Sequence, residues 1–362
     1  MRRTAALILG GGPAGSAAAI TLARGGLVPH LVERTTRPHD VVCGGFLGWD
    51  ALDALATLRI DVRALKAHPI HRLRLIAARS QVEVDLPHPA VGLSRRTLDE
   101  ALLNAARKSG VLVSRGRVAR ALEADRRVRF DDGEEFAPDA LFLATGKHEL
   151  RGGARPLQDR AEPPSIGLRA SLHASPALDV ALEGIIELHF FNGGYAGLLL
   201  QEDGTANLAI SAARARLSDA GGARALVNEI TREAPRLAER ISDHHPDAWT
   251  AIAGVPYGWR TAETQPGVFR LGDQSAVISS LAGDGVAIAL RSGIAAGLAL
   301  LAHGPAGAEA YQRGFSARAR RPLAVAEALR WAAERQGPRI ALMGLARVRG
   351  LTRLAARLTR IG

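Results

Sequence analysis

The chain has 362 residues, enough for two domains, and 47% of them are hydrophobic, which is ample for a buried core. Its single cysteine, Cys43, excludes an intramolecular disulfide and fits a reducing cytoplasm. Residues 313–362 hold twelve arginines and two acids, which account for +10 of the net charge of +11. Because no recognition motif or aromatic platform accompanies this charge, we do not expect a nucleic-acid partner.

The first 33 residues predict a strand, a glycine turn, a helix and a second strand that ends in an acid. Gly10 fits the tight turn, Gly12 lets the backbone approach a pyrophosphate, and Gly15 lets the helix pack on the strand. The helix N-terminus would bind phosphate, and Glu33 would accept a hydrogen bond from a ribose hydroxyl. The predicted dinucleotide contacts are Gly10, Gly12, Pro13, Ala14, Gly15 and Glu33.

Further along the chain, alternating and apolar segments predict more strands and helices. Up to residue 144 we expect a hairpin at 72–76 and 82–86, a helix at 98–109, a strand at 111–113, a β-meander at 118–136 and a strand at 140–144. Beyond it we expect strands at 166–172, 184–191, 195–201 and 206–212, helical segments at 218–241, a strand at 268–271 and a helix at 286–302.

A second glycine-rich motif follows the strand predicted at 268–271. It holds Gly272-Asp273 and then Gly283-Asp284-Gly285, after which a helix begins at Val286. This motif resembles the second FAD-binding motif of the para-hydroxybenzoate hydroxylase and geranylgeranyl reductase superfamily. The resemblance implies that Asp273 binds the ribityl and pyrophosphate region and that Gly283, Gly285 and Val286 start a helix aimed at the flavin pyrimidine. A helix N-terminus there stabilises the negative charge of a reduced flavin.

Three other segments extend the resemblance over residues 1–305. Arg95 matches an arginine that the family places near the flavin, and Glu33-Arg34 followed by Cys43-Gly44-Gly45 is similar to the geranylgeranyl reductase branch. Gly146 falls in the loop that the family places against the flavin. The resemblance therefore adds these expected FAD contacts: Arg34, Cys43, Gly44, Gly45, Arg95 and Gly146.

The fold that the resemblance implies is α/β, with a Rossmann-like FAD-binding domain and an inserted antiparallel β-sheet that roofs the flavin and carries the substrate pocket. A helical, basic C-terminal segment follows. We expect the FAD-binding domain at 1–71, 91–150 and 255–305, the roof domain at 72–90 and 151–254, and the C-terminal segment at 306–362.

The chain also departs from the family. Ser280 stands where the family usually has a proline near the flavin, and residues 144–151 lack the Asp and Ser of the family's middle motif. We therefore expect no NAD(P)H site of the usual kind, so that NAD(P)H would act only as an external reductant. Near Tyr195 the chain lacks the prenyl reductases' Tyr-x-Trp-x-Phe-Pro motif, and the halogenase Trp-x-Trp-x-x-Pro signature is also absent.

Three functions remain open. We favour an FAD-dependent monooxygenase that hydroxylates a hydrophobic phenolic lipid or polyketide-like molecule. The alternatives are a geranylgeranyl-reductase-like double-bond reductase or dehydrogenase, and a flavin-bearing protein that binds membrane surfaces without turnover. Candidate catalytic residues are Cys43, His189 and Tyr195, with a small buried hydrophobe as the alternative for Cys43 and a hydrogen-bonded sheet residue as the alternative for His189. No metal-ligand spacing is present.

The C-terminus predicts a basic amphipathic helix over 348–361. Five apolar residues fall on one face (Val348, Leu351, Leu354, Leu358 and Ile361) and four arginines on the other (Arg349, Arg353, Arg357 and Arg360). Residues 345–362 therefore fit either an anionic membrane surface or a packed helix with a solvated basic face. The most apolar stretch, 281–302, is interrupted by Asp284 and Arg291, so we expect no membrane span and a cytoplasmic protein, peripheral at most to the inner membrane surface.

Overall fold

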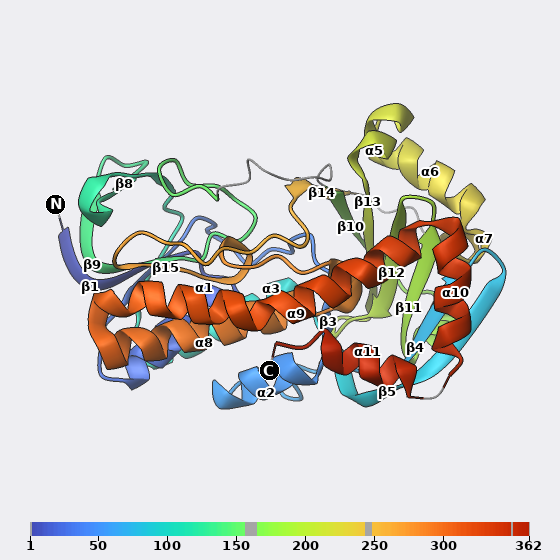
Figure 1. The fold of residues 1–362 in the computed structure, drawn as a ribbon, viewed down its shortest axis with the longest axis horizontal. Helices are drawn as coiled ribbons and strands as arrows, with labels where there is room; N and C mark the ends of the chain where they lie inside the picture. Colours follow the sequence, from blue (N-terminus) through green and yellow to red (C-terminus); the bar gives the residue numbers. More distant parts are fainter. Residues whose placement is uncertain (1, 156–164, 243–247, 349, 362) are drawn as a thin grey trace.

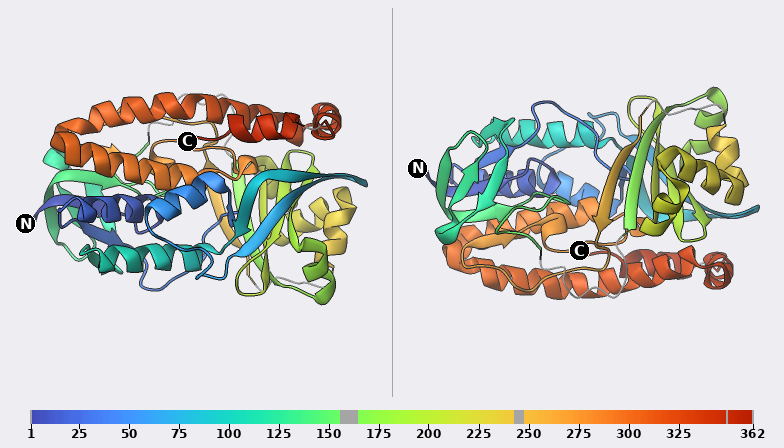
Figure 2. Two further views of the ribbon diagram at one scale, coloured as in Figure 1. Left: turned by 90° about the horizontal axis from the view of Figure 1, so that it is seen from below. Right: turned by 90° about the horizontal axis from the view of Figure 1, so that it is seen from above.

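Two β-sheets lie side by side, and the chain crosses between them several times (Figure 1). The computed structural model describes residues 2–155, 165–242, 248–348 and 350–361. Figure 2 shows the long helix α9 (Ala308–Glu334) running beside both halves of the molecule. It packs on β15 of the first sheet and on β11 and β12 of the second.

The first sheet has the strand order β6-β2-β1-β9-β8-β7, with β15 paired to β9. The core pairings β1–β2, β1–β9, β9–β15 and β2–β6 are parallel, as expected for a sheet covered on both faces. Its strands are β1 (Arg2–Leu9), β2 (His30–Glu33), β6 (Leu112–Arg115), β7 (Ala119–Leu122), β8 (Val128–Phe130), β9 (Glu135–Leu143) and β15 (Val268–Arg270).

Close helix packing organises this half of the molecule. Helix α1 lies against α8 so tightly that a Cβ at Gly293 would meet the carbonyl oxygen of Ala14 at 2.2 Å, and α1 also packs on α3. Helix α2 covers the outer side of α8. The helices of this half are α1 (Pro13–Arg24), α2 (Trp49–Thr57), α3 (Arg95–Lys108) and α8 (Gly285–His303).

The second sheet has the order β14-β10-β13-β12-β11-β4-β5-β3. All its pairings are antiparallel except β11–β4, where the hairpin β4–β5 from the first third of the chain joins the inserted strands. The strands are β3 (Phe46–Leu47), β4 (His68–Ala77), β5 (Ser80–Gly92), β10 (Ser165–His173), β11 (Gly184–Phe191), β12 (Gly194–Leu200), β13 (Thr205–Ala213) and β14 (Thr250–Val255).

Helices cover both faces of this second sheet. Buried residues of α4, α6 and α7 form one apolar core with its outer face, whereas α9 and α10 pack near Tyr195 and Phe190 on the other. The remaining helices are α4 (Pro176–Leu182), α5 (Arg214–Ala220), α6 (Ala223–Glu233), α7 (Pro235–Ile241), α10 (Gln336–Ala346) and α11 (Leu351–Leu358).

The structure confirms the predicted α/β class and corrects several element boundaries. The hairpin is longer than expected, because β4 and β5 span 68–92 and extend to the edge strand β3. The helical region 218–241 is divided into α5, α6 and α7 by Gly221-Gly222 and Pro235. The terminal helix, expected over 348–361, is limited to α11. By length and composition the helical stretch 285–334 would qualify as a membrane span, but half of its most apolar window is buried within the fold, as in a core helix.

Candidate functional site

A cavity of about 510 Å³ lies between the two sheets. Segments far apart in the sequence meet in its wall, and most of its lining is apolar. Of the residues proposed from sequence, those that line the cavity are Gly12, Pro13, Ala14, Cys43, Gly44, Gly45, Arg95, Gly146, Tyr195, Gly272, Asp273, Gly283, Gly285 and Val286.

The first glycine turn has no room for side chains. Gly10 has φ +112°, and a Cβ there would meet the Ala144 carbonyl oxygen at 2.3 Å. A Cβ at Gly15 would meet the Gly10 carbonyl oxygen at 1.9 Å. These two glycines do not touch the cavity themselves; they bring the first turn of α1, with its unpaired backbone N–H groups, to the cavity wall.

Glu33 ends β2 directly beside this turn. Its Oε2 accepts a hydrogen bond from the Gly11 N–H (2.7 Å) and its Oε1 accepts one from the Thr35 N–H (2.8 Å). Oε1 also accepts from the Thr35 hydroxyl (2.8 Å), so Oε2 is the oxygen that keeps a further lone pair for a ribose hydroxyl. Arg34 lies apart from the cavity lining, where its guanidinium is 2.8 Å from His148 Nε2.

Two cations and two carboxylates lie around the glycine segments. Arg95 donates to both oxygens of Asp99 (2.8 Å each), and this pairing outweighs burial, so the pKa of Arg95 is raised. Lys147 Nζ lies 3.4 Å from Asp273 Oδ2, which raises the pKa of the lysine and keeps it an ammonium. Both cations line the cavity and are suited to phosphate groups.

The Cys43-Gly44-Gly45 segment is fixed by a residue that sequence reasoning missed. The Asn207 side-chain amide, in β13, donates to the Cys43 and Gly44 carbonyls (3.0 and 2.9 Å). Asn207 Oδ1 in turn accepts from Arg169 (2.7 Å), so a buried polar chain joins the second sheet to this loop. A polar residue inside the apolar strand 206–212 was the only signal for it.

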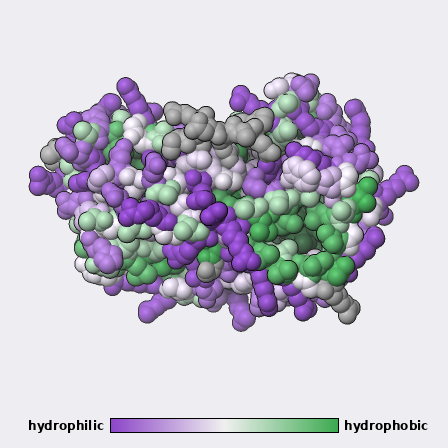
Figure 3. Space-filling model, viewed as in Figure 1, coloured by the Kyte–Doolittle hydropathy of each residue, from purple (hydrophilic) through white to green (hydrophobic). Residues whose placement is uncertain are grey.

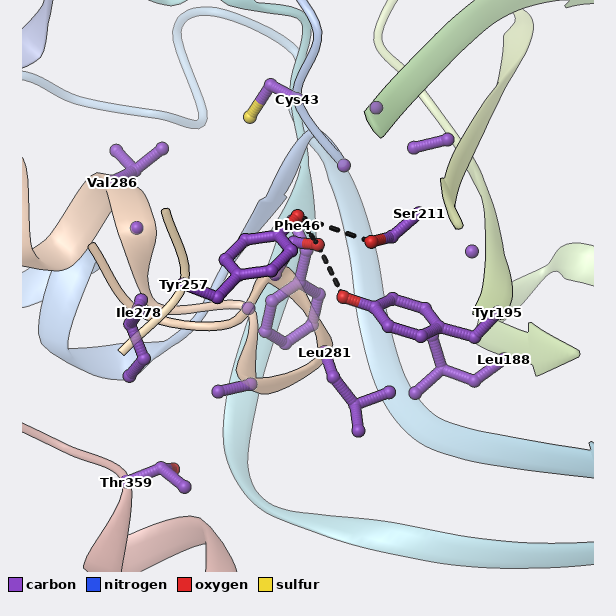
Figure 4. A pocket seen from close by; sticks show the side chains of 18 of the residues that line it. Cys43, Phe46, Leu188, Tyr195, Ser211, Tyr257, Ile278, Leu281, Val286 and Thr359 are labelled. Atoms are coloured by element: carbon purple, nitrogen blue, oxygen red, sulfur yellow. Dashed lines mark hydrogen bonds between the residues drawn. The ribbon is translucent and has the colours of Figure 1, made fainter. Parts of the chain in front are cut away.

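A cluster of hydroxyl groups lies in the cavity wall (Figure 4). The Tyr195 and Tyr257 hydroxyls lie 2.5 and 2.8 Å from Ser280 Oγ, and Ser211 donates to Tyr257 at 3.4 Å. Burial raises the pKa of Tyr195, so its phenol stays protonated at neutral pH. The cluster, defined as Tyr195, Ser211, Tyr257 and Ser280, is surrounded by apolar side chains that include Phe46, Leu188 and Leu281.

His189, a candidate catalytic residue from sequence, does not face the cavity. Strand alternation turns Ile186, Leu188 and Phe190 of β11 into the cavity and places His189 with Glu187 on the opposite face. There His189 Nε2 lies 3.0 Å from Glu187, and both side chains are fully buried. Glu187 also pairs with the partly exposed Arg74 and Arg240. We therefore withdraw His189 as a catalytic candidate.

The C-terminal residues reach the cavity, which corrects the expected basic face. Thr359 and Arg360 line it, and Arg360 pairs with Asp284 and lies over the Trp49 ring at 4.1 Å. Burial lowers the pKa of Arg360 to about 10. Ile361 is also buried, so neither residue belongs to an exposed amphipathic surface, and Arg349 lies outside the described residues.

These features together fit FAD. The α1 N-terminus, Arg95 and Lys147 supply positive charge for a pyrophosphate, Glu33 supplies an acceptor for a ribose, and the N-terminus of α8 at Gly285 opens into the same cavity. Within the described residues, no group of three His, Cys, Asp or Glu side chains is arranged to hold a metal ion.

Comparison with known proteins agrees with this geometry. Residues 3–136 match the family model described as FAD binding domain. A menaquinone reductase of Mycobacterium tuberculosis is 28% identical over 315 residues, which are 79% of this chain and 74% of that protein. A 2-heptyl-3-hydroxy-4(1H)-quinolone synthase of Mycobacteroides abscessus is 33% identical over 159 residues, 40% of each chain.

Solved structures share the whole fold at low sequence identity. The flavin-dependent brominase Bmp2 superposes with a TM-score of 0.81 at 16% identity and covers 99% of this chain and 93% of its own. A geranylgeranyl bacteriochlorophyll reductase-like protein from Thermoplasma acidophilum gives 0.79 at 18% identity, covering 100% and 94%. Residues 3–136 therefore carry an FAD binding domain, and the fold of the whole chain is consistent with the superfamily of FAD-dependent oxidoreductases.

Proposed function

We propose that this FAD-dependent oxidoreductase is a monooxygenase that hydroxylates the aromatic ring of a hydrophobic phenolic lipid or polyketide-like molecule. The cavity would hold the apolar part of such a molecule against leucines such as Leu73, Leu75 and Leu188. Hydrocarbon buried there contributes about 25 cal/mol for each Å² removed from water.

The hydroxyl cluster carries the proposal. Ser280 stands where the resembling family usually has a proline near the flavin. Because hydrogen bonds join Ser280 to the other members of the cluster, the four hydroxyl groups lie beside the expected reaction site. A phenolic ring can exchange hydrogen bonds with them. An isolated double bond in a prenyl chain has no donor or acceptor and would cover these polar groups with hydrocarbon.

The protein's part in the reaction is to bind and orient. Because burial keeps Tyr195 protonated, we expect it to donate a hydrogen bond to the substrate oxygen and not to remove a proton. When bound, FAD would supply the redox chemistry. In the overall reaction one atom of O₂ enters the ring and the other leaves as water, with two electrons and two protons drawn from a reductant.

A double-bond reductase is the second candidate. Two observations support it: the similarity to a menaquinone reductase over 79% of this chain, and the position of Cys43-Gly44-Gly45 in the cavity wall. In that case NAD(P)H or another donor would supply both electrons to the substrate and O₂ would not be consumed.

We also propose that the electrons come from a donor without a binding site of the usual kind on this chain. The chain has a single dinucleotide fingerprint. In the altered middle motif Glu149 accepts a hydrogen bond from Arg155 (2.6 Å), so Arg155 is not a free phosphate-binding group. We expect NAD(P)H to act from outside the chain's own binding sites. Fast, saturable flavin bleaching by NADPH in the absence of substrate would contradict this.

The decisive experiment supplies the FAD-loaded enzyme with a long-chain alkylphenol or an isoprenoid quinone, together with NADPH and a flavin reductase. Hydroxylation predicts substrate-dependent O₂ uptake and an alkylphenol product that gains an oxygen atom from ¹⁸O₂. A product whose prenyl side chain has lost a double bond and gained two hydrogen atoms, without ¹⁸O, would replace the proposal by the reductase, whereas reduction of the quinone ring to the quinol would not. Catalase controls for peroxide released without coupling to substrate.

A further inference from the structure

We propose that the face formed by α10 and α11 docks on an anionic lipid bilayer and opens the cavity toward it. This inference deepens the proposed function, because it names the source of the hydrophobic substrate. Figure 3 shows hydrophobic residues gathered around a hollow on the half of the molecule that carries the second sheet. In Figure 1 the helices α10 and α11 lie in front of that half.

Helices α10 and α11 and the segment between them carry large apolar side chains that are exposed. Ile340 and Leu345 of α10 are 71% and 55% exposed, and Leu354 of α11 is 50% exposed. Val348, between the two helices, and Leu351, the first residue of α11, are exposed as well. We call these five residues the apolar rim. Large apolar side chains gathered on one surface mark a binding site for an apolar partner.

The charge around the rim selects an anionic partner. Residues 335–362 contain seven arginines and no acidic residue. Arg335, Arg347, Arg353 and Arg357 are exposed, and within the described residues no carboxylate forms a salt bridge with the last three. On α11 the arginines 353 and 357 project on the same outward side as Leu354, while Thr352, Ala355 and Ala356 line the cavity. Apolar groups and unpaired cations on one surface fit an anionic membrane interface.

The rim is continuous with the cavity. Leu345 and Leu351 belong to both, and a second apolar groove between α9 and α10 shares Leu329, Leu342 and Leu345 with the cavity wall. A lipid that leaves the bilayer at this face would therefore meet hydrocarbon side chains until it reaches the hydroxyl cluster. A soluble polar substrate would gain nothing from such a route.

Vesicle co-sedimentation of the FAD-loaded full-length protein tests the proposal. Vesicles of phosphatidylglycerol and phosphatidylcholine should bind the protein at low salt, and phosphatidylcholine alone should bind it far less. The triple substitution Arg347→Gln, Arg353→Gln, Arg357→Gln should weaken binding about 100-fold, since each basic group contributes about 1 kcal/mol at an anionic surface. The control triple Arg3→Gln, Arg120→Gln, Arg232→Gln removes the same charge elsewhere and should keep most of the binding.

The apolar rim is tested separately. Val348→Glu with Leu354→Glu should abolish vesicle binding, whereas Val180→Glu, at a residue 81% exposed in α4, should not. Because all three positions are exposed, FAD content and circular dichroism should match the wild type. Equal binding by rim and control variants, or binding to a protein partner instead of vesicles, would overturn the proposal. If turnover of a detergent-dispersed alkylphenol persists in that case, the enzyme function stands and only the docking fails.

Discussion

At the scale of single residues, the hydroxyl cluster makes the sharpest prediction. Tyr195→Phe removes the hydroxyl that lies 2.5 Å from Ser280 and should raise KM for an alkylphenol roughly three- to tenfold, the effect of one lost hydrogen bond. FAD content should not change, because the cluster does not include the groups expected to hold the pyrophosphate, which are the α1 N-terminus, Arg95 and Lys147. Steady-state kinetics and the flavin-to-protein absorbance ratio measure both.

Tyr311→Phe is the matched control for this substitution. The Tyr311 hydroxyl is also buried, but it donates to the carbonyl oxygen of Arg270 in the core and does not line the cavity. It should lower stability and leave KM unchanged. An equal rise in KM in both variants would mean that Tyr195 acts only through packing.

Glu187 predicts the acid stability of the second sheet. Burial alone would raise its pKa, but hydrogen bonds from His189, Arg240 and Arg74 lower it to about 2. A carboxyl whose pKa is lower in the folded than in the unfolded state stabilises the fold above the unfolded pKa, near 4.5, and this stability is lost as the pH falls toward 2.

The contribution of Glu187 to stability follows from the difference between its pKa in the folded and unfolded states. Glu187→Gln should cost about 3 kcal/mol at pH 7 and flatten the dependence of unfolding free energy on pH between about 4.5 and 2. Glu83→Gln is the control, since Glu83 also pairs with Arg74 (2.9 Å) but is partly exposed, where such pairs contribute about 0–1 kcal/mol. Denaturant unfolding at several pH values would contradict the argument if the two variants behaved alike.

Among the helices and strands, those set by local sequence patterns could be predicted, whereas those set by contacts between distant segments could not. The first βαβ unit was foreseen because its glycines, helix and acid act within 33 residues. The parallel pairing of β11 with β4 joins residues more than 100 positions apart, and no periodicity encodes it. For the same reason the sequence could not decide which way His189 faces: alternation separates His189 from Phe190, but only the packing of helices such as α6 and α7 decides which face is covered.

The close contact of α1 and α8 yields a prediction for these elements. Gly293→Ala would bring a Cβ within 2.2 Å of the Ala14 carbonyl oxygen, so the helices must separate. We expect a loss of about 1–3 kcal/mol in stability and weaker FAD retention, because Ala14 belongs to the turn at the cavity. Gly344→Ala in α10, with nothing within 4 Å, should instead stabilise by about 0.5–1 kcal/mol. Thermal unfolding with flavin release measures both.

At the scale of the whole molecule, the cofactor site depends on both sheets. The first sheet supplies the glycine turn and Glu33, whereas Asn207 of the second sheet fixes the Cys43–Gly45 loop across the cavity. Helix α9 packs on both sheets and joins them mechanically. Binding of FAD at such a site stabilises the two halves together. This coupling could not be predicted from the glycine motif, because that motif lies in the first half alone.

This shared site predicts a single unfolding transition that FAD shifts as a whole. At FAD concentrations of 100 times Kd, the free energy of unfolding should rise by about 2.7 kcal/mol. Flavin release and far-ultraviolet circular dichroism should then give the same midpoint. Asn207→Leu should weaken FAD binding and reduce the shift at fixed FAD concentration, because the loop carbonyls of Cys43 and Gly44 lose their donor. Two separate transitions, of which only one moves with FAD, would show that the cofactor is held by the first sheet alone.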